Sequence, residues 1–335
     1  MAKASGFLEG IAIGDLHLGV HDSHGIPSSL TIETIRPAFD HAEEEGLPVF
    51  LLGDTFDTHR SSLDDPHYME FAEFLNRYTV PIHIIAGNHD QHEGIAHAFR
   101  GLLFLKRMGV LENVFIYMEP TVVVINGKRV NFLPYPHRAG INRALNIGHI
   151  DRAGSRYCNG YVVKEGSDDE YQWIIGHNHT KQQVRSACFP GTPVQVSPDE
   201  NHSFGYTHFR YGSTFSADHI PLKQAFKIQR LKLATPEIPE VDDDTWYAIT
   251  VEKGVPVPQD LYSRVNVYSL KGGTQAKEKK KKANKEPSNV SREDVLKAAV
   301  VAVAEEQGVD PITLREIMAT LPEVIGGADD RKGAG

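Results

Sequence analysis

Five short polar motifs follow predicted β-strands, and this arrangement constrains the fold more than any other feature of the chain. Four motifs come directly after an apolar run, and the fourth in order, at Gly148, follows a weaker run at residues 144–147. Ligands of α/β sheets bind at the carboxyl ends of strands, so we expect the motifs to converge on one site. The motifs are Gly14-Asp15-Leu16-His17, Gly53-Asp54-Thr55-Phe56-Asp57, Gly87-Asn88-His89-Asp90, Gly148-His149 and Gly176-His177-Asn178-His179.

The first 180 residues alternate short β-branched runs with amphipathic stretches. The β-α-β order with continuous apolar strands predicts an α/β fold whose sheet is covered by helices on both faces. Residues 186–233 look β-rich, and Asn126-Gly127 predicts a hairpin turn. Expected strands cover 11–13, 49–52, 82–86, 122–125, 130–133 and 173–175, and expected helices cover 31–45, 66–77 and 94–108.

The residue types in the motifs suit divalent metal ions. Carboxylate, imidazole and amide oxygen without thiolate favour Mn²⁺ or Fe²⁺ over a structural zinc ion. Alternate residues of an extended backbone, such as His177 and His179, point to the same side and can hold one ion. Two divalent ions outweigh the charge of Asp15, Asp54 and a bridging hydroxide, and the positive remainder suits a phosphodiester.

Each motif alone has an ordinary structural explanation. Asp-x-His is commonly a surface turn, Gly-Asp-x-x-Asp a turn or helix cap, and a single histidine a satisfied polar residue. All five in this order, each after a strand, argue against that explanation. We treat His21, His24, His92 and His97 as surface or helix residues and His137 as a weaker site candidate.

Composition excludes several classes of protein. Cys158 and Cys188 form no C-x-x-C pair, so neither a disulfide framework nor a thiolate zinc site is indicated. No apolar run is long enough for a membrane span, and the first residues do not resemble a signal peptide, so we expect a cytoplasmic protein. The net charge of −9 argues against a nonspecific nucleic-acid coat, although residues 271–286 hold seven lysines and two glutamates.

The character of the chain changes after residue 233. We expect a main domain over 1–233, a small α/β segment over 234–270, a Lys-rich linker over 271–289, a helical hairpin over 290–325 and a disordered tail over 326–335. Ser291 can cap the first helix of the hairpin. Such a hairpin cannot bury both of its faces alone, so it needs a partner surface.

The five motifs resemble those of the calcineurin-like metallophosphoesterases, over about residues 8–232. Within that superfamily the chain is most similar to the SbcD-type nuclease subunit of DNA double-strand-break repair complexes, in a bacterial or phage version. The additional residues are Phe56-Asp57-Thr58, the segment 189–197 followed by Glu200, and the segment 219–228. The resemblance implies a metallophosphoesterase β-sandwich flanked by helices, with a small α/β cap and a C-terminal helical hairpin.

The resemblance also implies a role for each motif residue. His89 would be the catalytic histidine that contacts the scissile phosphate and assists the leaving oxygen. Asp90 would either orient His89 or cap a helix, and both interpretations stay open. Some relatives carry histidine in place of Asp57, and here His59 lies two residues further on, where a surface histidine is the favoured interpretation. One metal would be held by Asp15, His17, Asp54 and His179, and the second by Asp54, Asn88, His149 and His177, with Asp54 bridging.

The implied function is a Mn²⁺-dependent DNA phosphodiesterase, acting as exonuclease and endonuclease. Residues 291–322 would dock on the coiled coil of an SMC-like ATPase, the alternative being that they pack on their own domain. The lysines of the linker would contact DNA phosphates or serve solubility only. The family tends to form homodimers through helices of its nuclease domain.

Two other functions compete with this one. A stand-alone enzyme for a small phosphodiester or phosphoprotein is disfavoured by the hairpin and by Pro190-Gly191-Thr192-Pro193. A noncatalytic scaffold is disfavoured by the intact ligand set and by His89.

Overall fold

The computed structural model describes residues 6–92, 98–167 and 169–274, which belong to one compact unit. Gly94 to His97, the expected start of the third helix, lie outside the described residues. The same holds for most of the expected Lys-rich linker, for the hairpin at 290–325 with its proposed contact at 291–322, and for the tail at 326–335. None of the described helices is long and apolar enough to cross a membrane.

A first sheet of six strands carries three of the five motifs. Its order is β12-β11-β1-β2-β3-β4. Strands β1 to β4 are parallel to one another, while β11 pairs antiparallel with β1 and with β12. The bounds are β1 Leu8–Ile13, β2 Val49–Leu51, β3 Ile82–Ile85, β4 Val114–Tyr117, β11 Gly205–Tyr211 and β12 Phe215–Pro221.

A second sheet of six strands carries the other two motifs. Its order is β5-β6-β7-β8-β10-β9, with β6, β7, β8 and β10 parallel. The predicted hairpin is confirmed, since Asn126 and Gly127 have φ of 48° and 75° between β5 and β6. The bounds are β5 Thr121–Ile125, β6 Lys128–Leu133, β7 Leu145–His149, β8 Trp173–Gly176, β9 Gln182–Val184 and β10 Ala187–Phe189.

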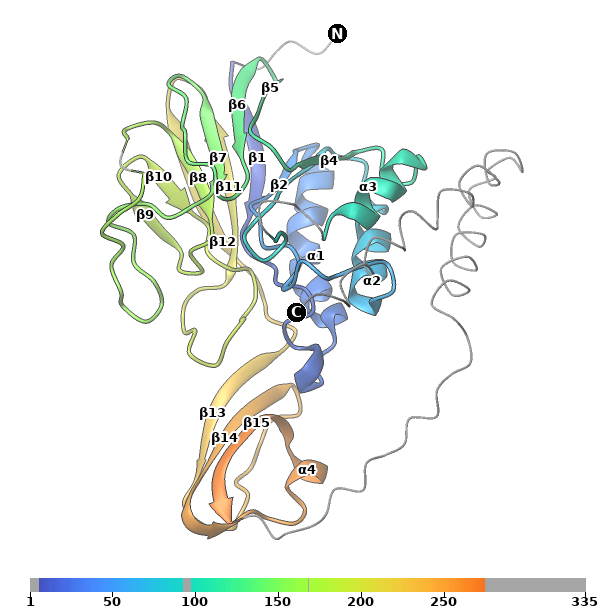
Figure 1. Ribbon diagram of the computed structural model, residues 1–335, viewed down its shortest axis with the longest axis vertical. Helices are drawn as coiled ribbons and strands as arrows, with labels where there is room; N and C mark the ends of the chain where they lie inside the picture. The colour runs from blue at the N-terminus through green and yellow to red at the C-terminus, as the bar shows by residue number, and fades with distance from the viewer. Residues whose placement is uncertain (1–5, 93–97, 168, 275–335) are drawn as a thin grey trace, which may run out of the picture. The chain divides into compact units, whose positions relative to one another are not determined.

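The first sheet is buried on both faces, by helices on one side and by the second sheet on the other (Figure 1). Alternate strand residues separate the two cores: Leu51 lies in the helix-facing core, whereas Phe50 and Leu52 pack with Val130 and Phe132 of the second sheet. The expectation of helices on both faces, drawn from the strand pattern, was therefore wrong for one face, whereas the β-sandwich flanked by helices that the resemblance implied is confirmed. Both arrangements bury continuous apolar strands, so periodicity alone does not distinguish them.

Three helices cover the outer face of the first sheet, and a short 3-10 helix, Asp22–His24, precedes them. They are α1 Ser28–Glu45, α2 Pro66–Leu75 and α3 Arg100–Arg107. Helix α1 ends at Gly46 in the left-handed conformation, as predicted. Helix α3 begins later than expected, because Ala98 donates its N–H to the Asp90 carbonyl and residues 98–99 form a turn.

A third, parallel sheet contains β13 Lys227–Leu233, β14 Thr245–Pro256 and β15 Asn266–Thr274, with the short helix α4 Leu261–Arg264 before β15. Strand β13 pairs along its whole length with β14. The third sheet therefore begins at Lys227, before the position at 233 where the sequence changes character.

Candidate metal centre

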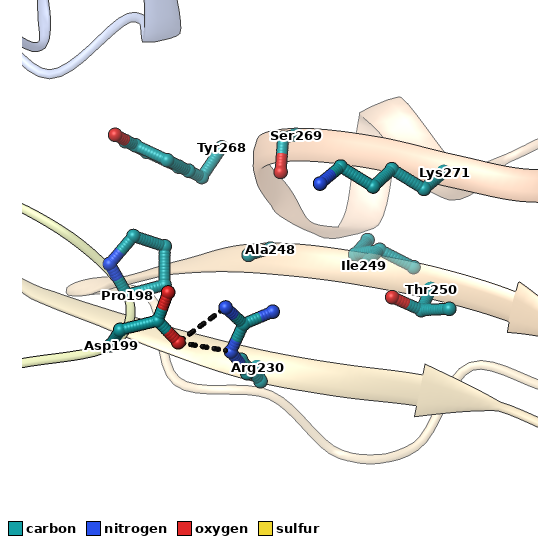
Figure 2. A pocket seen from close by; sticks show the side chains of 9 residues that line it. All are labelled: Pro198, Asp199, Arg230, Ala248, Ile249, Thr250, Tyr268, Ser269 and Lys271. Carbon is teal, nitrogen blue, oxygen red and sulfur yellow. Dashed lines mark hydrogen bonds and ion pairs between the residues drawn. The ribbon is translucent and has the colours of Figure 1, made fainter. Parts of the chain in front are cut away.

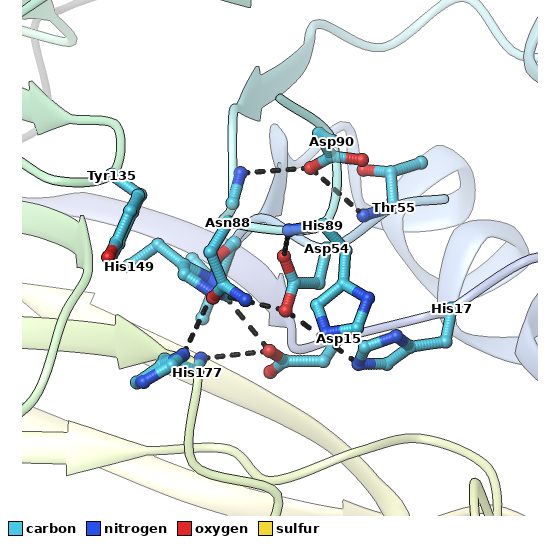
Figure 3. A network of polar contacts seen from close by, with 12 residues as sticks. Asp15, His17, Asp54, Thr55, Asn88, His89, Asp90, Tyr135, His149 and His177 are labelled. Atoms are coloured by element: carbon cyan, nitrogen blue, oxygen red, sulfur yellow. Dashed lines mark hydrogen bonds and ion pairs between the residues drawn. The ribbon is translucent and has the colours of Figure 1, made fainter. Parts of the chain in front are cut away.

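The five motifs meet where the carboxyl ends of β1, β2 and β3 approach those of β7 and β8 (Figure 3). Asp15, Asp54 and Asn88 follow strands of the first sheet, while His149 and His177 end or follow strands of the second. Among the described residues there are three groups in which the possible ligand atoms all lie within 4.8 Å of one another. They are Asp15/His17/His179, His17/Asp54/His89 and Asp54/His149/His177.

The first half of the site has an unsatisfied carboxylate oxygen between two imidazoles. Asp15 is fully buried, and its Oδ1 accepts the backbone N–H of His177 at 2.9 Å. Its Oδ2 has no hydrogen-bond partner among the described residues. The Nε2 atoms of His17 and His179 face each other at 3.2 Å. A buried orphan oxygen beside two imidazole nitrogens fits a divalent ion.

Asp54 lies between the two halves. Its Oδ2 is 3.8 Å from His17 Nε2 and 3.3 Å from His149 Nε2. Its Oδ1 accepts the backbone N–H of His89 at 2.8 Å. Burial alone would raise the pKa of Asp54, but His149 and His17 hold it far below its usual range. Asp54 is therefore ionised in the position that a bridging ligand requires.

The second half of the site is formed by Asn88, His149 and His177. His149 donates Nδ1–H to the Leu52 carbonyl at 2.8 Å, which directs its Nε2 into the site. That Nε2 is 2.9 Å from Asn88 Oδ1 and 3.2 Å from His177 Nδ1. Burial would lower the pKa of His149, but the charge of Asp54 raises it to about 9. A proton here compensates Asp54 as a cation would.

Three of the predicted ligands have a left-handed backbone. His17, Asp54 and His177 have φ of 46°, 47° and 74°. This region is costly for residues other than glycine and persists only where the surrounding structure enforces it. Of the six described non-glycine residues with positive φ, these three face the site, and strain of this kind is typical of functional positions.

Two glycines allow the motif loops to approach closely. A Cβ on Gly87 would lie 2.1 Å from Asp54 Oδ1. Gly191 has φ of 78°, and a Cβ there would lie 2.7 Å from the His179 carbonyl oxygen. The segment at 189–200 thus packs directly against His179, so its sequence serves the site itself.

Three acidic residues orient ligand histidines from outside the cage. Asp57 Oδ1 is 3.3 Å from His17 Nδ1, and Asp151 Oδ1 is 3.7 Å from His177 Nε2. Glu200 Oε1 accepts Nδ1–H of His179 at 2.6 Å, and the negative partner raises the pKa of His179 against the effect of burial. Sequence reasoning assigned none of these roles. Three signals in the sequence were available. Asp57 ends the second motif, Asp151 lies two residues after His149, and Glu200 follows the segment 189–197 that resembles the family.

The structure separates the two residues predicted as catalytic. The His89 side chain is 42% exposed, and its Nδ1 donates to the Asp57 carbonyl at 2.8 Å. Asp90 is fully buried and accepts backbone N–H groups of Thr55, Phe56 and Gly87 at 3.2, 2.9 and 2.9 Å. Burial raises the pKa of Asp90 to about 7. Asp57, rather than Asp90, contacts the His89 side chain, and Asp90 ties the second and third motifs together.

The other histidines that the sequence singled out belong to none of the three ligand groups found among the described residues, and His21 is not the surface or helix residue that was expected. His21 is buried and bonds the Gln195 carbonyl at 2.9 Å, and His24 stacks on Tyr268. His59 stacks on His92 at 4.9 Å between ring centroids. His137 lies 3.7 Å from Glu119, and His97 is outside the described residues.

A separate pocket of about 260 Å³ lies on the third sheet (Figure 2). It has small residues such as Ala248 and Ser269, the cations Arg230 and Lys271, and Asp199, which pairs with Arg230. Asp199 precedes Glu200, the residue that bonds His179, so the pocket and the cage share one loop.

Comparison with known families agrees with this geometry. The family model described as calcineurin-like phosphoesterase matches residues 11–218, a range that contains every motif residue. No curated protein matches the chain.

Proposed function

The chain belongs to the calcineurin-like phosphoesterase family, and on this premise we propose that it is a Mn²⁺-dependent DNA phosphodiesterase that acts as exonuclease and endonuclease. Family membership makes it a metal-dependent hydrolase of phosphoester bonds that uses two divalent ions. DNA as substrate, Mn²⁺ as the metal and a cytoplasmic location are our proposals.

The observation that carries the proposal is a half-exposed histidine beside a buried two-site cage. One ion would be held by Asp15, His17, Asp54 and His179, and the other by Asp54, Asn88, His149 and His177. When bound, two such ions activate water and neutralise charge on a phosphoester.

His89, positioned by Asp57, would contact the phosphate and donate a proton to the leaving group. The Asp57 carbonyl accepts Nδ1–H of His89, so Nε2 is the ring atom left for a substrate. The Asp57 carboxylate Oδ1 also lies 3.6 Å from the same Nδ1. A protonated His89 can contact a phosphate oxygen and give its Nε2 proton to the leaving alkoxide.

The choice of DNA rests on the resemblance to SbcD-type subunits, in the segments 189–200 and 291–322. We propose that residues 291–322 bind an SMC-like ATPase and that the protein can form homodimers. The segment at 189–200 packs against His179. Its resemblance to the SbcD-type sequence is therefore stronger support for the metal site than for DNA as the substrate.

One assay tests the substrate. The purified protein with Mn²⁺ is offered linear duplex DNA, single-stranded DNA and bis-p-nitrophenyl phosphate, beside His89→Gln. Cleavage of DNA that is lost in the variant is expected. Fast turnover of the small ester without DNA cleavage would show that the substrate is a small phosphodiester and not DNA. Inactivity on all three substrates would favour a noncatalytic scaffold.

A further inference from the structure

The two flanks of the cage differ in chemistry. Beside His17 and His179 the orienting groups are the carboxylates of Asp57 and Glu200. Beside His177 lie two aromatic rings, with centroids 6.5 Å away for Tyr135 and 6.3 Å away for Tyr157. Both flanks carry a carboxylate, since Asp151 Oδ1 lies 3.7 Å from His177 Nε2, so the aromatic rings are what distinguishes the His177 flank.

A pair of tyrosines leads outward from His177. The Tyr157 hydroxyl donates to Asp151 Oδ1 at 2.6 Å, and that same carboxylate faces His177. The Tyr157 ring lies 6.2 Å from the Tyr161 ring, centroid to centroid. Tyr161 is 57% exposed. An aromatic surface therefore continues from a predicted metal ligand into solvent.

The turn that carries Tyr161 is held by its own hydrogen bonds. Tyr157 N–H donates to the Tyr161 carbonyl, Gly160 N–H donates to the Tyr157 carbonyl, and Tyr161 N–H donates to Asn159 Oδ1, each at 2.9 Å. Gln182 bonds both backbone groups of Arg156 at 2.8 and 2.9 Å. A lone exposed tyrosine is ordinary, but one whose backbone is held in this way has less backbone freedom to lose when a ligand binds.

We propose that Tyr161, supported by Tyr157, is a stacking platform for a nucleobase of an unpaired nucleic-acid strand beside the scissile phosphate. This inference rests on the proposed function and narrows its substrate to strands with accessible bases. Every base has a π-face, so such a platform tolerates any sequence. Arg156 and Lys164, both exposed on the same loop, supply cations for the strand's phosphates.

Equilibrium binding tests the platform independently of cleavage. In a His89→Gln background, fluorescence anisotropy measures the Kd of a single-stranded oligonucleotide and of the same oligonucleotide with abasic residues. The additional variants are Tyr161→Ala, Tyr161→Phe and the matched control Tyr262→Ala, which removes an exposed tyrosine from α4.

Tyr161→Ala should raise the Kd for the normal oligonucleotide roughly 5- to 150-fold, the range that follows from loss of one stacked base. Tyr161→Phe and Tyr262→Ala should leave it unchanged, and on the abasic oligonucleotide Tyr161→Ala should have no effect. An unchanged Kd in Tyr161→Ala, or an equal loss on both oligonucleotides, overturns the platform. Failure of the wild-type protein to cleave any DNA would instead overturn the proposed function.

Discussion

The Nε2 atoms of His17 and His179 lie 3.2 Å apart, although 162 positions separate the two residues in the chain. Two imidazole nitrogens at this distance share a proton or a metal ion, because bare lone pairs would repel. The contact joins the end of β1 in the first sheet to the loop after β8 in the second. An ion in this position would cross-link the two sheets.

Metal removal should therefore destabilise the fold. A ligand at about 100 times its Kd contributes about 2.7 kcal/mol to the free energy of unfolding, so EDTA should lower Tm by about 5 °C or more. Differential scanning fluorimetry before and after Mn²⁺ is added back measures this. His179→Ala should reduce the shift, whereas His137→Ala, outside the cage, should keep it. Equal Tm values with and without EDTA would contradict the cross-link.

His89→Gln should separate catalysis from metal binding. Loss of a positioned general acid lowers kcat roughly 10²- to 10⁴-fold. Because the His89 side chain bonds Asp57 and remains half-exposed, metal content measured by mass spectrometry should stay at the wild-type value. His149→Ala is the contrasting variant and should lose bound metal. A metal-depleted His89→Gln protein would show that His89 is a ligand.

Glu200 should control metal affinity from outside the cage. Removing a carboxylate that orients a ligand histidine typically weakens metal binding 10- to 100-fold. Glu200→Ala should therefore raise the Kd for Mn²⁺ in isothermal titration calorimetry. Glu200→Gln, which retains an acceptor for His179 Nδ1–H, should have a smaller effect. Asp199→Ala, at the neighbouring position that pairs with Arg230, is the matched control. If all three variants bind Mn²⁺ alike, the orienting role is wrong.

Asp90→Ala should affect stability more than chemistry. It leaves the backbone N–H groups of Thr55, Phe56 and Gly87 without their acceptor, and each buried unsatisfied group costs about 1–3 kcal/mol. Urea unfolding should show a large loss of stability, and any folded fraction should bind less metal. A variant with wild-type stability and a reduced kcat would restore the catalytic interpretation of Asp90.

The two cysteines should differ in reactivity with pH. Burial raises the pKa of Cys188 to about 11, so its reactive thiolate is scarce at pH 8 and increases as the pH rises towards that value. Cys158 is exposed. Iodoacetamide at pH 8 should modify Cys158 first, as measured by peptide mass spectrometry. Rapid labelling of Cys188 in the folded protein would contradict its burial.

The convergence of the motifs was predictable because each follows a strand, and strand ends gather in α/β sheets. The hairpin at Asn126-Gly127 and the end of α1 at Gly46 followed from local backbone preferences, which depend on few neighbours. The second sheet over Phe50 and Leu52 followed from the resemblance of the motifs but not from the strand pattern, because apolar alternation is the same whether a helix or a sheet covers it.

The acidic partners of the histidines were harder to find from sequence. Glu200 lies 21 residues from His179 and meets it only through the close approach of Gly191. The role of Asp90 depended on the fold as well, because its three donors come from two separate loops. Pairings of this kind are set by tertiary contacts and leave no local pattern.

The left-handed backbones of His17, Asp54 and His177 imply a conflict between folding and activity. At these positions glycine would relax the chain, while only a side chain with a lone pair can serve the site. A lineage released from catalysis could become more robust by substitution at these positions. The side chains present at these positions are what an active enzyme requires, and glycine in their place would mark a protein that has the fold without the reaction.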